Sequence, residues 1–175
     1  KYGRTVRSLY EFGCGTGHHL LRMREVNKTA KIYGLDWAEA SQKIIGEMVD
    51  KGILENAEGK NFDFFNPDKS FDIDQDSVVF TIAALEQVGD KHKNFIDYLI
   101  SKKPGLCIHI EPVAELLDNQ VLLDYLSTQY IKKRNYLWGF LDNLRDLEKL
   151  GKIEIVSATR NKIGHLFLEG YMIII

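Results

Sequence analysis

The chain has 175 residues, a length that suits one domain and is sufficient to bury a hydrophobic core. With 45% hydrophobic and 27% charged residues, its composition is that of an ordinary soluble globular protein. A net charge of -2 excludes a polycationic surface for nucleic acid or an anionic membrane, and no apolar run is long enough to span a bilayer.

Short apolar runs alternate with segments of helical period along the whole chain. In chain order, we expect a strand over Thr5–Phe12, a helix over Gly17–Val26, a strand over Ala30–Leu35, a helix over Ala38–Lys51, strands over Lys60–Phe65 and Ser77–Leu85, a helix over Lys91–Ser101, a strand over Gly105–Glu111, two helices within Ala114–Leu150 broken near Ile131–Asn135, and strands over Ile153–Thr159 and His165–Ile175.

This order of elements predicts an α/β fold. Alternating strands and helices indicate a doubly wound, mostly parallel sheet covered by helices on both faces, a three-layer α/β/α arrangement. Only a few residues separate the last two strands, so these two should form an antiparallel pair at the C-terminal end. We expect residues 1–175 to form a single domain, with 114–150 as a long helical region inserted on the substrate side.

The two cysteines, Cys14 and Cys107, form neither a disulfide framework nor a zinc-binding spacing. This usage fits a reducing compartment, and with no visible signal peptide we expect a cytoplasmic protein. The chain begins a few residues before its first predicted strand and ends within a strand-like run. We therefore expect a trimmed domain that lacks N-terminal segments.

A glycine-rich turn, Gly13-Cys14-Gly15-Thr16-Gly17, follows the first predicted strand. Glycine permits positive φ and close approach to a ligand, and the next helix directs its N-terminal amides toward the same place. A dinucleotide-binding loop needs G-x-G-x-x-G, whereas here the third glycine comes one residue early, at Gly17. The spacing argues against NAD or FAD and favours a ligand without a pyrophosphate.

An acidic residue, Asp36, ends the second predicted strand and is followed by Trp37. A carboxylate at this place can accept two hydrogen bonds from a ribose diol, and the indole offers a flat face for an adenine. Trp37 also fits a role as a cap on the core.

The segment Glu11-Phe12-Gly13-Cys14-Gly15-Thr16-Gly17 resembles the motif of class I S-adenosylmethionine-dependent methyltransferases, an acidic residue followed by x-G-x-G-x-G. The resemblance implies S-adenosylmethionine as cofactor and S-adenosylhomocysteine as product. It implies that Glu11 and the glycine turn, Cys14 included, hold the methionine part. Because no activating partner is apparent in the sequence, Cys14 is expected to be a small space-filling residue and not a nucleophile. It further implies that Asp36 binds the ribose, Asp63 the adenine amino group, and that Phe64 supplies an amide or a stacking face. Asp63 fits a plain turn residue as well.

Methyl transfer to a hydroxyl usually needs a general base near the carboxyl ends of the fourth and fifth strands. The candidates are Glu86, His109 and Glu111, and strand alternation places the last two on one side. The alternatives are a hydrogen-bonded core histidine for His109 and helix caps for the two glutamates. The three could also hold a divalent metal, which is less favoured because histidine suits magnesium poorly. His18 and His19, at a helix start, are expected to face solvent, and the alternative is that one of them faces the cofactor pocket.

A polar-aromatic cluster around the predicted helix break contains Tyr130, Arg134, Asn135 and Tyr136. Such side chains suit a sugar or another polar small molecule, or else a contact between helices or within a homo-oligomer. The Asn/Asp-Pro-Pro-aromatic signature of adenine N-methylation is replaced by Ala83-Ala84-Leu85-Glu86, which argues against nucleic-acid bases as acceptors.

The resemblance therefore implies an S-adenosylmethionine-dependent methyltransferase that O-methylates a sugar or another small metabolite. It is most similar to small methyltransferases of bacterial polysaccharide or secondary-metabolite pathways. Two alternatives stay open: a catalytically silent cofactor-binding module that acts as a partner subunit, and a nucleotide-dependent oxidoreductase.

Overall fold

The computed structural model describes residues 2–165 and 168–175. Its elements, in chain order, are β1 (Ser8–Phe12), α1 (His18–Val26), β2 (Lys31–Asp36), α2 (Glu39–Asp50), β3 (Ala57–Asn61), β4 (Ser77–Ile82), the 3-10 helix η1 (Leu85–Val88), α3 (Lys93–Lys102), β5 (Leu106–Glu111), the 3-10 helix η2 (Ala114–Leu116), α4 (Leu122–Arg134), α5 (Phe140–Lys149), β6 (Ser157–His165) and β7 (Leu168–Ile174).

The strands form one sheet in the order β3-β2-β1-β4-β5-β7-β6. Strands β1 to β5 pair in parallel, whereas β7 is antiparallel to both β5 and β6. The predicted mostly parallel sheet with a C-terminal antiparallel pair is therefore confirmed. From β1 the chain first builds outward to β3 and then returns to β4 on the other side of β1, which makes the β1–β4 junction the topological switch point.

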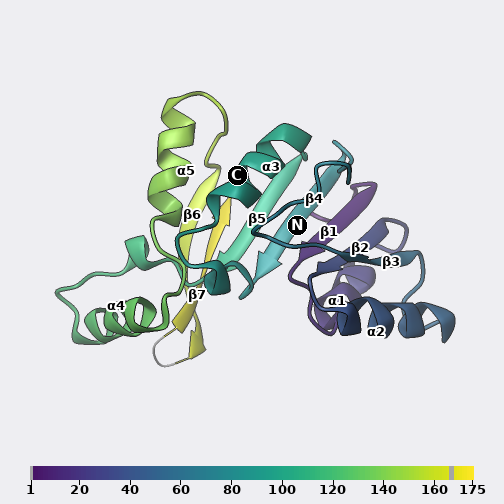
Figure 1. Cartoon of the computed structure of the whole chain (residues 1–175), viewed down its shortest axis with the longest axis horizontal. Helices are drawn as coiled ribbons and strands as arrows, with labels where there is room; N and C mark the ends of the chain where they lie inside the picture. The colour runs from purple at the N-terminus through teal and green to yellow at the C-terminus, as the bar shows by residue number, and fades with distance from the viewer. Residues whose placement is uncertain (1, 166–167) are drawn as a thin grey trace.

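Helices cover both faces of the sheet, as Figure 1 shows, with α1 and α2 on one side and α3 and α5 on the other. The period-2 alternation of the strands explains the two layers. In β1, Leu9 packs with Leu20 of α1 and Ile45 of α2, whereas Phe12 belongs to the core that contains Phe95 of α3. The three-layer α/β/α prediction is confirmed.

Two predicted strands are displaced. The third strand is Ala57–Asn61 and not Lys60–Phe65, because the apolar residues after Asn61 leave the sheet edge and pack into the core, where Phe62 contacts Phe12 edge to face. The sixth is Ser157–His165 and not Ile153–Thr159, and Ile153 packs instead against the core on the α3 side.

The long helical region contains two α-helices, α4 and α5, with the break at residues 135–139. Residues 114–121 form only the short η2 and a turn. Helix α4 is tied to β6 by a bidentate pair in which Arg160 donates to both oxygens of Asp124, at 2.6 and 2.7 Å. Among residues 2–165 and 168–175, no helix combines the length and the apolar character needed to cross a membrane.

Candidate functional site

A cavity of about 730 Å³ lies at the switch point, beyond the carboxyl ends of β1, β2 and β4. Ligands of open α/β sheets bind at this position. Six of the residues predicted to bind a cofactor line it, namely Gly13, Gly15, Asp36, Trp37, Asp63 and Phe64. Three others predicted for the same role, Glu11, Cys14 and Gly17, are next to it in the chain but do not form its wall.

The glycine turn is in the left-handed region at all three glycines, with φ of 77° at Gly13, 52° at Gly15 and 76° at Gly17. The N–H groups of Gly13 and Cys14 donate to the Leu35 carbonyl, at 2.7 and 3.1 Å, and so fasten the turn to β2. A Cβ at Gly13 would overlap the Ala84 methyl, whereas a Cβ at Gly15 would meet nothing within 4 Å. Gly13 is therefore needed for packing, and Gly15 leaves an open space at the cavity wall.

The carboxylate of Asp36 is positioned by two backbone amides. Its Oδ2 accepts a hydrogen bond from the Gly15 N–H at 2.8 Å, and its Oδ1 accepts one from the Ala38 N–H at 2.9 Å. Each oxygen keeps a further lone pair for a ligand. Beside it, Trp37 is 76% exposed, so the alternative in which this residue caps the core is wrong.

Asp63 and Phe64 form another part of the wall. Asp63 accepts hydrogen bonds from the Phe65 N–H at 2.8 Å and from the Asn66 side chain at 3.1 Å, which is the geometry of an Asx turn. The ring of Phe64 packs edge to face on Phe95, with ring centroids 4.8 Å apart. Asp63 is thus a turn residue that also lines the cavity.

The carboxyl group of Glu11 is buried beneath the turn, with 0% exposure. Its Oε1 lies 2.7 Å from His19 Nδ1, so His19 turns one ring nitrogen toward Glu11 while 28% of its side chain stays exposed to solvent. Desolvation, with a smaller contribution from nearby Asp36, raises the pKa of Glu11 to about 8. Burial likewise raises the pKa of Cys14 to about 12, which keeps its thiol protonated and fits a space-filling role.

The imidazole of His109 is part of the core, with 0% exposure. Its Nδ1 lies 3.0 Å from Thr81 Oγ1, and its ring packs edge to face on Phe140 with centroids 5.4 Å apart. Burial lowers the pKa of His109 to about 3, so the ring is neutral at physiological pH. It does not line the cavity, and this geometry favours the core histidine over the predicted general base.

The buried state of His109 has a consequence for stability at low pH. Its pKa falls from an ordinary 6.5 to about 3 on folding, so the unfolded chain binds more protons between these values. The stability that the neutral ring contributes is present above pH 6.5 and is lost as the pH falls toward 3. Denaturant titrations at several pH values should show a shallower acid loss for His109→Gln than for the wild type; parallel curves would contradict a core position.

Glu111 accepts hydrogen bonds from three successive backbone amides at the start of η1. The N–H groups of Ala84, Leu85 and Glu86 donate to its two oxygens at 3.1 to 3.2 Å. Glu111 is fully buried. It caps the turn before η1, whereas one alternative expected it to cap the helix that follows its own strand. The position of Glu111 therefore suits a structural role, in which it holds the β4–η1 segment in place, better than a role as general base for a substrate.

The β4–η1 segment supplies cavity residues that the sequence did not single out. Ala83, Ala84, Gln87 and Val88 line the cavity, whereas the predicted Glu86 does not. In a 3-10 turn residues i and i+3 share a face, so Ala84 and Gln87 point the same way and Glu86 another. Asn61 and Phe65 complete the wall and were also missed.

A second, smaller pocket of about 330 Å³ contains two of the four predicted substrate residues. Asn135 and Tyr136 line it together with Asp90, Lys132 and Trp138. Arg134 lies over the ring of Tyr136 with its Cζ 5.6 Å from the centroid, and the rings of Tyr130 and Tyr136 are 6.1 Å apart. The four predicted residues therefore form one cluster. Val88 of the larger cavity is only two residues from Asp90, a span of at most about 7 Å.

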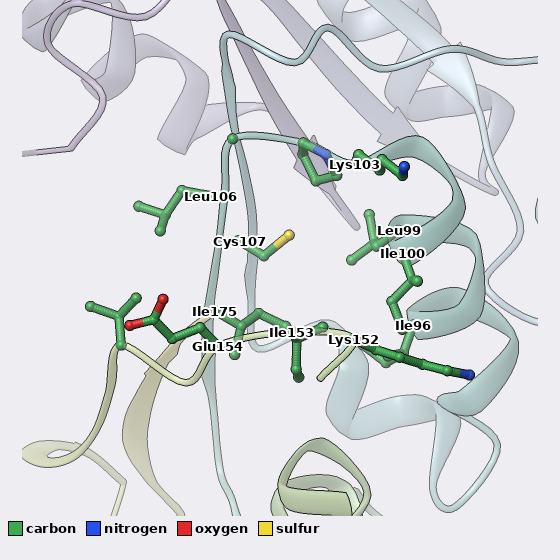
Figure 2. A pocket seen from close by; sticks show the side chains of 13 residues that line it. Ile96, Leu99, Ile100, Lys103, Leu106, Cys107, Lys152, Ile153, Glu154 and Ile175 are labelled. Atoms are coloured by element: carbon green, nitrogen blue, oxygen red, sulfur yellow. The ribbon is translucent and has the colours of Figure 1, made fainter. Parts of the chain in front are cut away.

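Another hollow, also of about 330 Å³, lies at the amino end of β5, whereas the cofactor cavity lies beyond the carboxyl ends of the strands. Figure 2 shows Ile96, Leu99 and Ile100 of α3 around it with Cys107 and Ile153. Across the described parts of the chain, no three His, Cys, Asp or Glu side chains are grouped in a way that could hold a metal ion.

Solved structures with the same fold include several methyltransferases. A methyltransferase from Aquifex aeolicus, described as dependent on S-adenosylmethionine, shares 15% identity over 99% of this chain and 85% of its own, with a TM-score of 0.64. The mitomycin 7-O-methyltransferase MmcR shares 12% identity over 98% of this chain and 49% of its own, with a TM-score of 0.70. NcsB1, an O-methyltransferase from neocarzinostatin biosynthesis, shares 13% identity over 99% of this chain and 49% of its own, with a TM-score of 0.69.

The chain thus spans about half the length of these two O-methyltransferases. A comparison with curated protein sequences gave no match. The family model described as a methyltransferase domain matches residues 8–149, which include the glycine turn, Asp36 and every element from β1 to α5. The chain therefore belongs to the methyltransferase domain family, with the class I fold that its glycine motif predicts.

Proposed function

We propose that this chain transfers a methyl group from S-adenosylmethionine to a hydroxyl group of a sugar or another small metabolite. The observation that carries the proposal is the cavity at the β1–β4 switch point, with Gly15 and Asp36 on its wall. Its volume of about 730 Å³ falls within the range of small-molecule sites. Membership of the methyltransferase domain family supports the same chemistry.

The residues around the cavity fit such a cofactor. Asp36 keeps free lone pairs for the two ribose hydroxyls, and the exposed ring of Trp37 can stack on the adenine. The open space beside Gly15 would admit the chain that joins the ribose to the amino acid part. Glu11 Oε2, buried and without a hydrogen-bond partner among the described residues, suits an ammonium group. The bound cofactor would supply a sulfonium methyl group.

The smaller pocket is the proposed acceptor site. Asn135 and Tyr136 offer hydrogen-bonding groups, and Trp138 offers an apolar face, a combination that suits polar small molecules. Asp90 contributes a carboxylate to this pocket, whereas Glu86, His109 and Glu111 line neither it nor the cofactor cavity. MmcR and NcsB1 are named as O-methyltransferases, which supports a hydroxyl acceptor here. The chain itself would orient the acceptor and remove its proton.

Calorimetric titration with S-adenosylmethionine and S-adenosylhomocysteine tests the proposal. Asp36→Ala should weaken both ligands about tenfold or more, because it removes a charged acceptor of two hydrogen bonds, a loss of about 1.5–3 kcal/mol. Asp50→Ala, which removes an exposed carboxylate at the end of α2, is the matched control and should bind as the wild type does. Wild-type protein that binds neither ligand would contradict the cofactor assignment.

Turnover separates the enzyme from a silent cofactor-binding module. Transfer of a labelled methyl group to any member of a panel of sugars and phenols would establish catalysis. Binding of both ligands without transfer to any acceptor would favour the module. Binding of a nicotinamide dinucleotide in their place would revive the oxidoreductase, against which the position of Gly17 argues.

A further inference from the structure

The pair formed by Glu11 and His19 joins β1 to the first turn of α1. Nδ1 of His19 lies 2.7 Å from Oε1 of Glu11, and the side chains are 28% and 0% exposed, respectively. The His18 ring lies against the His19 ring, with centroids 3.7 Å apart. A hydrogen bond of this length to a fully buried carboxyl group fixes that group in one orientation.

The other oxygen of the same carboxyl group, Oε2, is buried and has no hydrogen-bond partner among the described residues. Buried carboxylate oxygens are nearly always hydrogen-bonded, so this one calls for a donor from outside the chain. The titratable groups that face Glu11 are His19 from α1, Asp36 from the end of β2 and the Cys14 thiol. With one anionic neighbour and a thiol beside it, the oxygen is suited to a cation.

Resting on the function proposed above, we propose that His19 is a positioning residue for the cofactor. By binding Oε1 of Glu11 it holds Oε2 as an acceptor for the α-ammonium group of S-adenosylmethionine, directly or through one water molecule. His19 need not touch the cofactor, because it acts through Glu11. Its contribution is therefore limited to ligands that carry the amino acid part.

Because His19 should affect only ligands with an amino acid part, the experiment compares a ligand that has this part with one that lacks it. Dissociation constants are measured for S-adenosylhomocysteine and for methylthioadenosine, which has the nucleoside and the thioether but no amino acid part. His19→Phe, which keeps a ring but no nitrogen, should weaken S-adenosylhomocysteine about tenfold or more and leave methylthioadenosine within about twofold. His19→Asn, whose amide can donate from a position close to that of Nδ1, should restore most of the affinity. His18→Phe is the matched control and should change neither constant.

The pH profile is a second readout that a purely structural role would not move. Glu11 must be ionised to hold an ammonium group, and a donor at Oε1 favours its ionised form. Affinity for S-adenosylhomocysteine should therefore rise with pH in the wild type. The rise should occur at higher pH in His19→Phe, and at the wild-type pH in His18→Phe.

The possible outcomes are distinct. Equal weakening of both ligands by His19→Phe, or no weakening of either, would overturn the role of His19 while leaving the cofactor assignment intact. Wild-type protein that binds neither ligand would instead reject the proposed function. Should His19→Phe fail to fold, His19→Leu and the profile of His19→Asn supply the same comparison.

Discussion

Replacing Glu111 by alanine is expected to lower the free energy of unfolding by about 3 kcal/mol or more. The substitution leaves the N–H groups of Ala84, Leu85 and Glu86 without their shared acceptor, and each unsatisfied buried donor costs about 1–3 kcal/mol. Urea unfolding followed by circular dichroism measures the change. The same variant should also bind S-adenosylhomocysteine more weakly, because these residues hold the cavity wall.

Two further variants sharpen this expectation. Glu111→Gln keeps one acceptor oxygen and should lose less stability than the alanine variant. Glu39→Ala removes an exposed carboxylate on α2 and should stay within about 0.5 kcal/mol of the wild type. A loss below about 1 kcal/mol for Glu111→Ala would mean that water replaces the carboxylate, and that Glu111 does not fix the turn.

The second large effect separates stability from binding within one glycine turn. Gly13→Ala should cost about 3 kcal/mol of unfolding free energy, since it adds a left-handed alanine and an overlap with the Ala84 methyl. Gly15→Ala should cost only about 1 kcal/mol, because nothing lies within 4 Å of the added methyl group. That methyl group would stand in the proposed cofactor space and should reduce affinity for S-adenosylhomocysteine at least about tenfold.

Thermal unfolding and calorimetric titration of both variants make the comparison. Normal affinity in Gly15→Ala would place the cofactor elsewhere in the cavity. A stable Gly13→Ala would show that the β4–η1 segment yields to the added methyl group, which is hard to reconcile with the three N–H groups by which it is bound to Glu111.

The sequence predicted the fold because hydrophobic alternation reports directly on which strand faces are buried. Val78 and Phe80 enter one core and Val79 the other, as the period of two requires. Strand β3 was displaced in the prediction because its residues, Ala57–Asn61, are polar at the sheet edge and the more apolar run follows it. Local pattern does not reveal that Phe62 belongs to the core between layers.

For a similar reason, the sequence predicted the cofactor side of the site but not the role of the residues on β5. The positions of Gly13, Gly15 and Asp36 follow from motif spacing and from the rule that strand ends meet at one sheet edge. That His109 and Glu111 share a side of β5 was also correct, since Cys107, His109 and Glu111 are all buried. Whether that side faces a cavity or a helix depends on how α3 and α5 pack over it. Strand periodicity shows which residues share a side but not what covers that side.

The place of β7 in the sheet has a consequence for how the chain is synthesised. Strand β7 lies between β5 and β6, so β6 is attached to the sheet only through a strand that comes after it in the chain. While a ribosome is still translating the codons for β7, Ser157–His165 has no neighbour to pair with, although β1 to β5 can already assemble. A premature stop before Leu168 would accordingly cost the sheet two strands and expose the side of β5.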